Sequence, residues 1–397
     1  MRITTLLILA LFLACNTAQQ PDQKEVPDTE GTPKEIEEEV IEQKPMINTT
    51  KPYYLHLEGT ISDYPINMEL MYFPNRYESS PGYQGYYYYQ KYGEIIDLYG
   101  SEEEPGLISL SESDVQGNNT GNFQGRLNEQ GHFEGRWISG DQKRTLPFEL
   151  KPSDQSMLSF DLLLFSDSLL IEGFKTKKVP RIHVNQRWLY PKDSGDATLV
   201  RFLRSEIGKN IVGDSLAAIY TTPKAAFHVD KIGYFQEYKE DILSILEGEQ
   251  ENHDEIGWTV NYEIYRDMEI YFLSPTLLTF GVMDYYYTGG AHGNYSTAVH
   301  TYDLTKKKAI KLEDLFKPGY EETMSQILAA KARETYGIEP SQALSEFFFV
   351  DQIDPTENFG LTDKGIFFVY NPYEIAAYVY GEIKLFVAFE EVKEWVK

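Results

Sequence analysis

Short runs of alternating apolar and polar residues dominate the chain from residue 53 to residue 150. Alternation with a period of two is typical of strands with one buried face, and the Gly, Asp and Asn residues between the runs are typical of turns. About eight short strands in roughly 100 residues predict a small antiparallel β-barrel or a strongly curved sheet. The clearest runs are 53–60, 66–73, 86–90, 95–99, 107–112 and 145–150.

A short internal repeat lies within this region. The segment GNFQGR at 121–126 returns as GHFEGR at 131–136. Strand alternation places Phe123 and Gly125 on one face, and a turn at 128–131 would let Phe133 pack beside Phe123. The repeat therefore predicts two adjacent strands of the barrel.

Helical periodicity joins the strands beyond Lys151. Thr222 and Pro223 are typical of a helix start, and Gly248 marks the expected end of that helix. A second helix is predicted over 321–336. The strand-like runs around them predict an α+β domain at 180–397 with a mostly antiparallel sheet, after a connector at 151–179. These runs are 259–265, 270–273, 277–287, 295–303, 365–370 and 383–389.

The first residues have the pattern of an exported protein. Arg2 precedes an apolar run from Leu6 to Leu13, which is too short to span a membrane and fits a secretory signal. Cys15 follows Leu-Phe-Leu-Ala, which resembles a bacterial lipobox. We expect a lipoprotein signal peptide at 1–14 and a diacylglycerol group on Cys15. The alternative is an ordinary signal peptide with a chance cysteine.

The segment 15–50 is rich in acidic residues and proline, and it contains almost no aromatic residues. Such a composition cannot bury enough apolar surface to fold, so we expect a disordered tether that holds the folded part away from the membrane. The expected location is the bacterial cell envelope, with the protein lipid-anchored on the outer membrane, on a periplasmic or surface face.

Composition excludes several classes of function. The net charge of −26 argues against nucleic-acid binding, because phosphate contacts need clustered Lys and Arg. Because the chain has a single cysteine, it can form neither an intramolecular disulfide framework nor a zinc site built on several cysteines. No cofactor is expected, and the sequence contains no dinucleotide, Walker A or common hydrolase motif.

Three motifs in the second half occur in a characteristic order: YYYTGGAHG at 285–293, IKLEDLF at 310–316, and GIFFVYNPYEIAAY at 365–378. Together they resemble the extracytoplasmic domain shared by RsiV-type anti-sigma factors and PdaC-type peptidoglycan deacetylases. The resemblance covers roughly residues 180–397 and is strongest from 277 onward. It implies an α+β domain that binds lysozyme in the RsiV case and has no known catalysis of its own. Because no transmembrane run and no deacetylase motif is recognisable in the sequence, we expect neither the sigma-factor control nor the deacetylation of those proteins.

The resemblance places the expected contact surface at the glycine-rich turn and at the segment 371–378. We expect binding residues at His292, Tyr295, Pro372, Tyr373 and Tyr378. The alternative for Pro372 and Tyr373 is a rigid turn with a buried ring.

Other features have two interpretations each. The loop 288–293 is either a structural turn or binding loop, or a catalytic loop using His292, and we favour the former because no nucleophile or paired acid is adjacent. His292 and His300 lack a third metal ligand, so no metal site is expected. The tyrosines between 83 and 99 either form a sugar- or peptide-binding platform or pack in the core; alternation along the strand favours packing for most of them.

We therefore expect a lipid-anchored, non-catalytic binding protein that engages a cationic protein such as lysozyme or a peptidoglycan fragment. An acidic protein speeds its encounter with basic surfaces. Two alternatives stay open. One is an envelope enzyme acting on cell-wall glycan with two carboxyl groups in a pocket, and the other is a structural lipoprotein.

Overall fold

The computed structural model describes residues 50–76, 80–114, 116–153, 158–172, 179–193, 195–248 and 260–397. The predicted signal peptide, Cys15 and all of the tether except its last residue lie outside these ranges. The described residues from 50 to 397 belong to a single compact unit.

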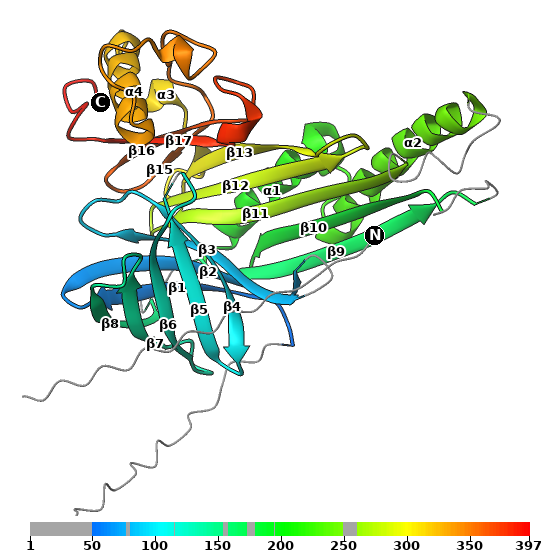
Figure 1. The fold of residues 1–397 in the computed structure, drawn as a ribbon. Coiled ribbons are helices and arrows are strands. Elements are labelled where there is room, and N and C mark those ends of the chain that lie inside the picture. The colour runs from blue at the N-terminus through cyan, green and yellow to red at the C-terminus, as the bar shows by residue number, and fades with distance from the viewer. Residues whose placement is uncertain are drawn as a thin grey trace, which may run out of the picture. The chain divides into compact units, whose positions relative to one another are not determined.

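Eight antiparallel strands close into a barrel at the start of the described chain (Figure 1). Each strand pairs with the next, and β1 pairs with β8 to close the barrel, for example at Gly59 and Leu150. The predicted barrel is confirmed. Its strands are β1 (Tyr53–Ile61), β2 (Tyr64–Arg76), β3 (Ser80–Tyr89), β4 (Ile96–Glu104), β5 (Leu107–Ser113), β6 (Asn119–Leu127), β7 (Phe133–Ser139) and β8 (Thr145–Pro152).

The two copies of the repeat form β6 and β7, as expected, and Gly125 lies opposite Gly135. The prediction that Phe133 packs beside Phe123 is wrong, because Phe148 of β8 packs between the two rings. Its ring centroid lies 5.2 Å from that of Phe123 and 4.7 Å from that of Phe133. The missing side chain at Gly125 leaves room for Phe148, since a Cβ there would lie 2.6 Å from the Phe148 ring.

A six-stranded sheet follows the barrel, in the order β14-β13-β12-β11-β10-β9. All pairs are antiparallel except β10 and β11, which are parallel. The runs predicted at 259–265 and 270–273 are one strand, β11, with an irregularity between Ile270 and Phe272. The strands are β9 (Phe160–Leu170), β10 (Arg181–Pro191), β11 (Asn261–Leu273), β12 (Leu277–Tyr287), β13 (Asn294–Asp303) and β14 (Lys308–Ala309).

The expected connector at 151–179 contains the edge strand β9, and β10 was also not predicted. β9 mixes half-buried and exposed positions along its length, so its sequence lacks a clean alternation. It is held by pairing with β10 along eleven residues.

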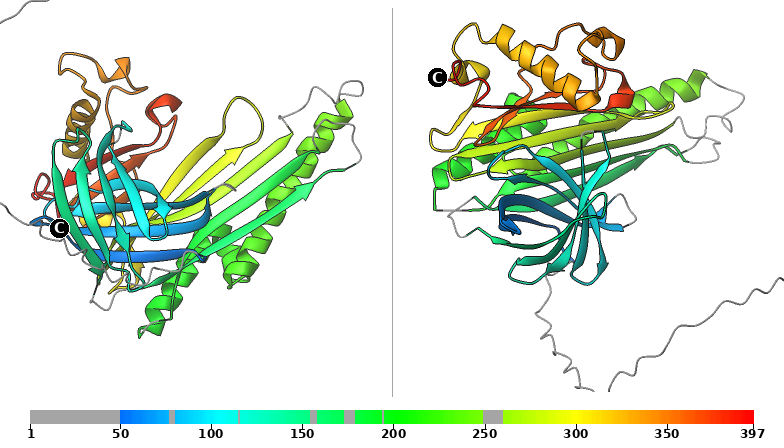
Figure 2. Two further views of the ribbon diagram at one scale, coloured as in Figure 1. Left: turned by 60° about the horizontal axis from the view of Figure 1, so that its bottom comes forward. Right: turned by 60° about the vertical axis from the view of Figure 1, so that its left-hand side comes forward.

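Two helices cover one face of this sheet, α1 (Ala197–Ala217) and α2 (Pro223–Gly248) (Figures 1 and 2). The second agrees with the predicted helix, and α1 was missed. α1 begins at Asp196, whose side chain accepts hydrogen bonds from the N–H groups of Thr198 and Leu199. It is interrupted at Gly213, which has a φ of 77°.

The C-terminal part is a small α+β subdomain. The helix α4 (Glu321–Tyr336) has the predicted bounds and ends at Gly337 in the left-handed conformation. Met324, Leu328 and Ala332 are buried against a three-stranded antiparallel sheet. The remaining elements are α3 (Leu312–Leu315), η1 (Leu344–Glu346), β15 (Phe359–Leu361), β16 (Gly365–Tyr370), η2 (Tyr378–Tyr380) and β17 (Ile383–Ala388).

Candidate functional site

A cavity of about 650 Å³ opens where the barrel, the six-stranded sheet and the C-terminal subdomain meet. Tyrosines and carboxylates dominate its walls. The lining residues are Gln84, Tyr86, Asp97, Tyr99, Ser113, Asp114, Gly117, Tyr265, Asp267, Glu269, Tyr271, Met283, Tyr285, Tyr295, Thr297, Tyr380, Gly381, Glu382 and Lys384.

Strand alternation explains why polar side chains reach this cavity. Along β11, Ile264, Met268 and Ile270 pack toward α1 and α2, so the residues between them point to the opposite face. That face carries Tyr265, Asp267, Glu269 and Tyr271. β3 and β4 behave alike, because their inward residues fill the barrel and their outward residues line the cavity.

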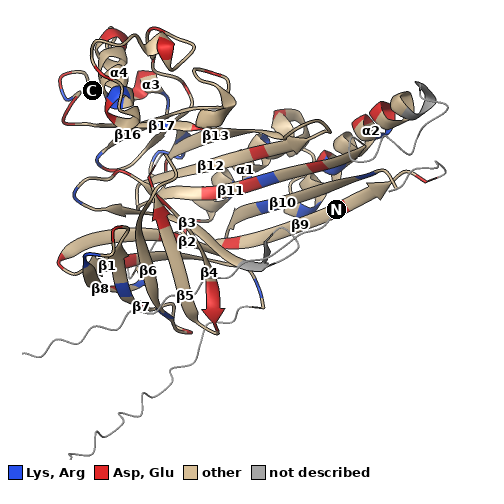
Figure 3. Cartoon of the chain, viewed as in Figure 1, with Lys and Arg blue, Asp and Glu red and all other residues tan. Residues whose placement is uncertain are grey.

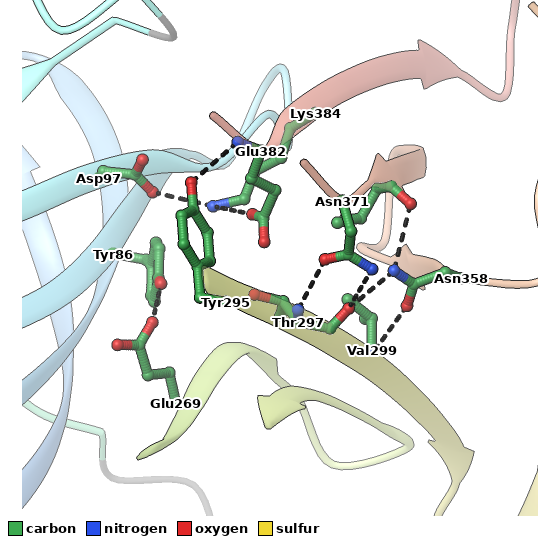
Figure 4. Close-up of polar contacts among 11 residues, drawn as sticks. Tyr86, Asp97, Glu269, Tyr295, Thr297, Val299, Asn358, Asn371, Glu382 and Lys384 are labelled. Carbon is green, nitrogen blue, oxygen red and sulfur yellow. Dashed lines mark hydrogen bonds and ion pairs between the residues drawn. The ribbon is translucent and has the colours of Figure 1, made fainter. Parts of the chain in front are cut away.

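Lys384 of β17 lies at the centre of the polar contacts (Figure 4). Its Nζ is 3.4 Å from Asp97 Oδ1 of β4 and 3.3 Å from Glu382 Oε1. The ammonium also lies 5.4 Å from the ring centroid of Tyr86 and 5.2 Å from that of Tyr271, which is cation–π geometry. The neighbouring carboxylates raise the pKa of Lys384 against the opposing effect of burial. Lys384 therefore joins the C-terminal subdomain to the barrel as a charged group.

Glu269 is a buried carboxyl group in the same wall, and Tyr86 of the barrel donates a hydrogen bond to it (Figure 4). Burial raises the pKa of Glu269 to about 7; repulsion from Asp267 adds to the rise, whereas the Tyr86 hydrogen bond and Lys384 oppose it. Such a group changes its protonation near neutral pH.

Asp267 is neutralised by an ion pair with Arg187 of β10. The guanidinium of Arg187 also stacks over the ring of Phe73 in the barrel, 4.2 Å from its centroid. β10 carries arginines and no acidic residue, whereas β11 carries residues of both signs (Figure 3). Among the lining residues, five are carboxylates and one is an amine, so the cavity is acidic.

Four of the five predicted binding residues gather beside the cavity. Tyr295 lines it, and its hydroxyl accepts a hydrogen bond from the N–H of Glu382 at 3.0 Å (Figure 4). Tyr378 stacks on His292 with ring centroids 4.4 Å apart, and it also contacts the rings of Tyr295 and Tyr373. This group of four rings, His292, Tyr295, Tyr373 and Tyr378, is called the aromatic cluster below.

Pro372, the fifth predicted residue, is buried, so its ring presents little surface to a partner. Its neighbour Asn371 accepts a hydrogen bond from the N–H of Thr297 at 2.6 Å, which fixes the turn against β13 (Figure 4). Tyr373 has a φ of 71° and a side chain on the surface, half exposed. The ring of Pro372 is thus buried in the turn, whereas the ring of Tyr373 is not.

The glycine-rich loop has structural reasons for its glycines. Gly289 and Gly290 have φ values of 87° and 99°, which L-residues rarely adopt. Gly293 lies under the ring of Tyr285, where a Cβ would be 2.4 Å from the ring. His292 donates from Nδ1 to the carbonyl of Gly293.

His300 does not share a site with His292, because its side chain points to the other face of the sheet. It packs against Phe280 at 5.4 Å, on the face of β13 opposite Tyr295, and burial lowers its pKa to about 4. In the described ranges, no group of three His, Cys, Asp or Glu residues is placed to hold a metal ion.

The tyrosines of β3 divide as alternation predicts. Tyr83 and Tyr87 lie in the barrel core, whereas Tyr86 and Tyr88 face outward and pack on Tyr271 and Phe272 of β11. Packing therefore accounts for most of them. Tyr92 and Tyr99 are exceptions, since 57% and 42% of their surfaces are exposed, and Tyr99 lines the cavity.

The central polar residues were missed in the sequence. They come from β4 (Asp97), β11 (Asp267 and Glu269) and the segment 382–384 at the start of β17 (Glu382 and Lys384), and only the fold brings them together. One signal was present: in the run Tyr265 to Tyr271, every second residue is aromatic or acidic. Treating this run as two strands hid that pattern.

One family model matches the C-terminal part of the chain. Residues 313–390 match the family model described as "Protein of unknown function (DUF3298)". The chain carries a DUF3298 domain. This domain spans most of α3 to β17 and contributes Tyr380, Gly381, Glu382 and Lys384 to the cavity.

Two solved structures are similar to the chain. One is a DUF3298 family member from Bacteroides fragilis NCTC 9343, with 26% sequence identity, a TM-score of 0.54, and coverage of 60% of this chain and 94% of that chain. The other is a DUF3298 family protein from Pseudomonas aeruginosa PAO1, with 17% identity, a TM-score of 0.40 and the same coverage, 60% and 94%. No curated protein matches the sequence.

Proposed function

We propose that the protein is a lipid-anchored binding protein of the bacterial cell envelope, and that its acidic, tyrosine-lined cavity receives basic side chains of a cationic protein such as lysozyme. The observation that carries this proposal is the acidic excess at the cavity: five carboxylates line it, against the amine of Lys384 and the guanidinium of Arg187 that neutralises Asp267.

The chemistry of the walls suits an ammonium or guanidinium group. Carboxylates attract the charge, and tyrosine rings offer their faces to it while their hydroxyls accept hydrogen bonds. The protein's own Lys384 shows this mode of contact, since it lies over two tyrosine rings between two carboxylates. Half-buried rings such as Tyr265, Tyr285 and Tyr380 remain partly accessible.

The aromatic cluster extends the contact area beyond the cavity. A partner that inserts a basic side chain would also cover these rings, and aromatic residues are enriched at protein interfaces. The resemblance to the RsiV-type domain supports the choice of lysozyme. A peptidoglycan fragment is the alternative ligand, because its sugars would stack on the same tyrosines.

Anchoring rests on Cys15, which lies outside the described residues. The described helices include none that is long and apolar enough to cross a membrane. We expect labelling of the chain by radioactive palmitate in a bacterial host, and loss of the label in Cys15→Ser. A labelled Cys15→Ser variant would contradict the anchor.

The binding proposal is tested by titrating the full chain with lysozyme and with peptidoglycan fragments at low and at physiological salt. We expect lysozyme binding at both salt concentrations, weakened about tenfold by Glu382→Gln and unchanged by the surface control Glu149→Gln. Absence of lysozyme binding at low salt would remove this partner. Binding that vanishes at physiological salt would show attraction of charge alone.

A second function is favoured by Glu269. With a pKa of about 7 it could serve as a general acid, and Asp267 lies two residues away on the same face of β11. Two residues along a strand separate the Cα atoms by roughly 7 Å, a spacing compatible with the carboxyl separation in inverting glycosidases. The ion pair between Asp267 and Arg187 opposes this role. Release of reducing sugar from peptidoglycan, abolished by Glu269→Gln, would establish it.

A further inference from the structure

A second cavity, of about 660 Å³, lies between α1, α2 and the end of β10. Its floor is apolar: Trp188, Val200, Ile207 and Ile211 line it and are at most 5% exposed. The volume lies within the range of pockets that hold small ligands. None of these residues contributes to the acidic cavity.

Small residues keep this space open. Gly208 on α1 faces Ala217, because a Cβ at Gly208 would lie 3.6 Å from the Cβ of Ala217. The interruption of α1 at Gly213 lets the chain turn so that Ala217 and Ala218 also line the cavity. Larger side chains at these positions would fill the space, and an unfilled apolar cavity lowers stability. The retained volume therefore suggests an apolar ligand.

The charge at the cavity is positive, in contrast to the rest of the molecule. Arg201 lines it, is exposed, and forms no hydrogen bond or ion pair with another described residue. Arg204 also lines it, but its guanidinium is occupied: Nε and Nη2 donate to the carbonyl of Pro191, and Nη1 pairs with Asp193 at 3.0 Å. Arg201 is thus available to an anion.

Exposed aliphatic side chains continue the apolar surface outward. Leu216 is 39% exposed and Ile219 is 70% exposed, and they flank Ala217 and Ala218 of the cavity wall. An apolar interior, an aliphatic rim and one available cation together match a ligand with a hydrocarbon chain and a single negative head.

We propose that this cavity binds a medium-chain fatty-acid carboxylate, with its hydrocarbon chain against Trp188, Ile207 and Ile211 and its carboxylate at Arg201. This site is separate from the cationic-ligand cavity, and neither proposal depends on the other. Affinity should rise about fourfold for each added CH₂ until the cavity is filled.

Trp188 provides the readout, because a bromine atom on the bound chain quenches a nearby indole. The full chain carrying Cys15→Ser, which avoids competition from an acyl group of its own, is titrated with brominated dodecanoate. We expect saturable quenching that is absent in Trp188→Phe and abolished in Gly208→Leu. Arg201→Gln should weaken binding at least tenfold, whereas Arg136→Gln, an exposed arginine on the barrel, should not change it.

Three results would overturn the proposal: no saturable quenching of the parent chain, equal affinity for dodecanol and dodecanoate, or unchanged quenching in Arg201→Gln. Because Arg201 is exposed, that variant tests the site even where Gly208→Leu impairs folding.

Discussion

At the scale of single residues, burial determines at which pH Glu269 ionises. The free energy of unfolding should therefore change with pH. The pKa of about 7 in the folded protein exceeds the value of about 4.3 expected after unfolding. The folded state therefore binds more protons between these values, so this group's contribution to stability is complete below about pH 4.3 and is lost as the pH rises through 7.

Glu269→Gln removes this titration and keeps an acceptor for the Tyr86 hydroxyl. Between about pH 4.5 and about pH 8, the free energy of unfolding of the parent chain should fall by roughly 3 kcal/mol relative to the variant. Urea unfolding across this range measures the difference, and the exposed control Glu149→Gln should follow the parent. Identical pH profiles for the parent and Glu269→Gln would show that Glu269 is ionised in the folded state.

Residue-level expectations succeeded where strand alternation alone decides the answer. The opposite directions of Tyr86 and Tyr87 follow from neighbouring positions on β3. The burial of Pro372 is not visible in the local sequence, because it depends on the contact of Asn371 with β13, which is 74 residues away in sequence. Lys384 was missed for the same reason, since its partner Asp97 is 287 residues away.

At the scale of elements, the side chains of Asn358 and Asn371 form hydrogen bonds with backbone groups along the edge of β13 that β14 leaves unpaired. β14 pairs only with Tyr302 and Asp303, so the N–H and carbonyl groups before them need other partners. Asn358 accepts a hydrogen bond from the N–H of Val299 at 2.8 Å and donates to the carbonyls of Thr297 and Val369 (Figure 4). The DUF3298 domain, which carries Tyr373 and Tyr378, is thereby attached to the strand that carries Tyr295.

Asn358→Ala should lower the free energy of unfolding by about 2–4 kcal/mol, because it removes three hydrogen bonds and leaves backbone groups of β13 unpaired. Asn294→Ala is the matched control, since Asn294 is an exposed residue at the start of the same strand. Urea unfolding compares the two. Equal stability of both variants would mean that water replaces Asn358 at no cost.

Elements were predictable where a single periodicity persists. The helix over 321–336 and the barrel strands have clear patterns and end at glycine or other turn residues, and the sequence located them. α1 was missed although Val200, Leu203, Ile207 and Ile211 form its buried stripe; the glycines at 208 and 213 obscure this stripe. β9 lacks an alternating pattern and depends on its neighbour, so no local signal identifies it.

At the scale of the whole molecule, Lys384 connects the barrel with the DUF3298 domain. Lys384→Met would leave Asp97 and Glu382 without their cation in a partly buried site. Removing one partner of a buried ion pair costs about 3–5 kcal/mol, and partial exposure of Asp97 places the expectation near the lower value. The double variant Lys384→Met with Asp97→Asn should recover part of the loss; no recovery would contradict the ion pair.

The lipid anchor, the cationic partner and the envelope location are proposals. The central proposal is that the acidic cavity binds the cationic partner. Its most direct test is a pair of substitutions that add the same charge at two exposed tyrosines. Tyr99 lines the cavity, and Tyr64 lies on the barrel outside it. The dissociation constant for lysozyme at physiological salt should rise at least about tenfold for Tyr99→Lys and stay within about twofold for Tyr64→Lys. Equal effects of the two substitutions would place the partner elsewhere and contradict the account.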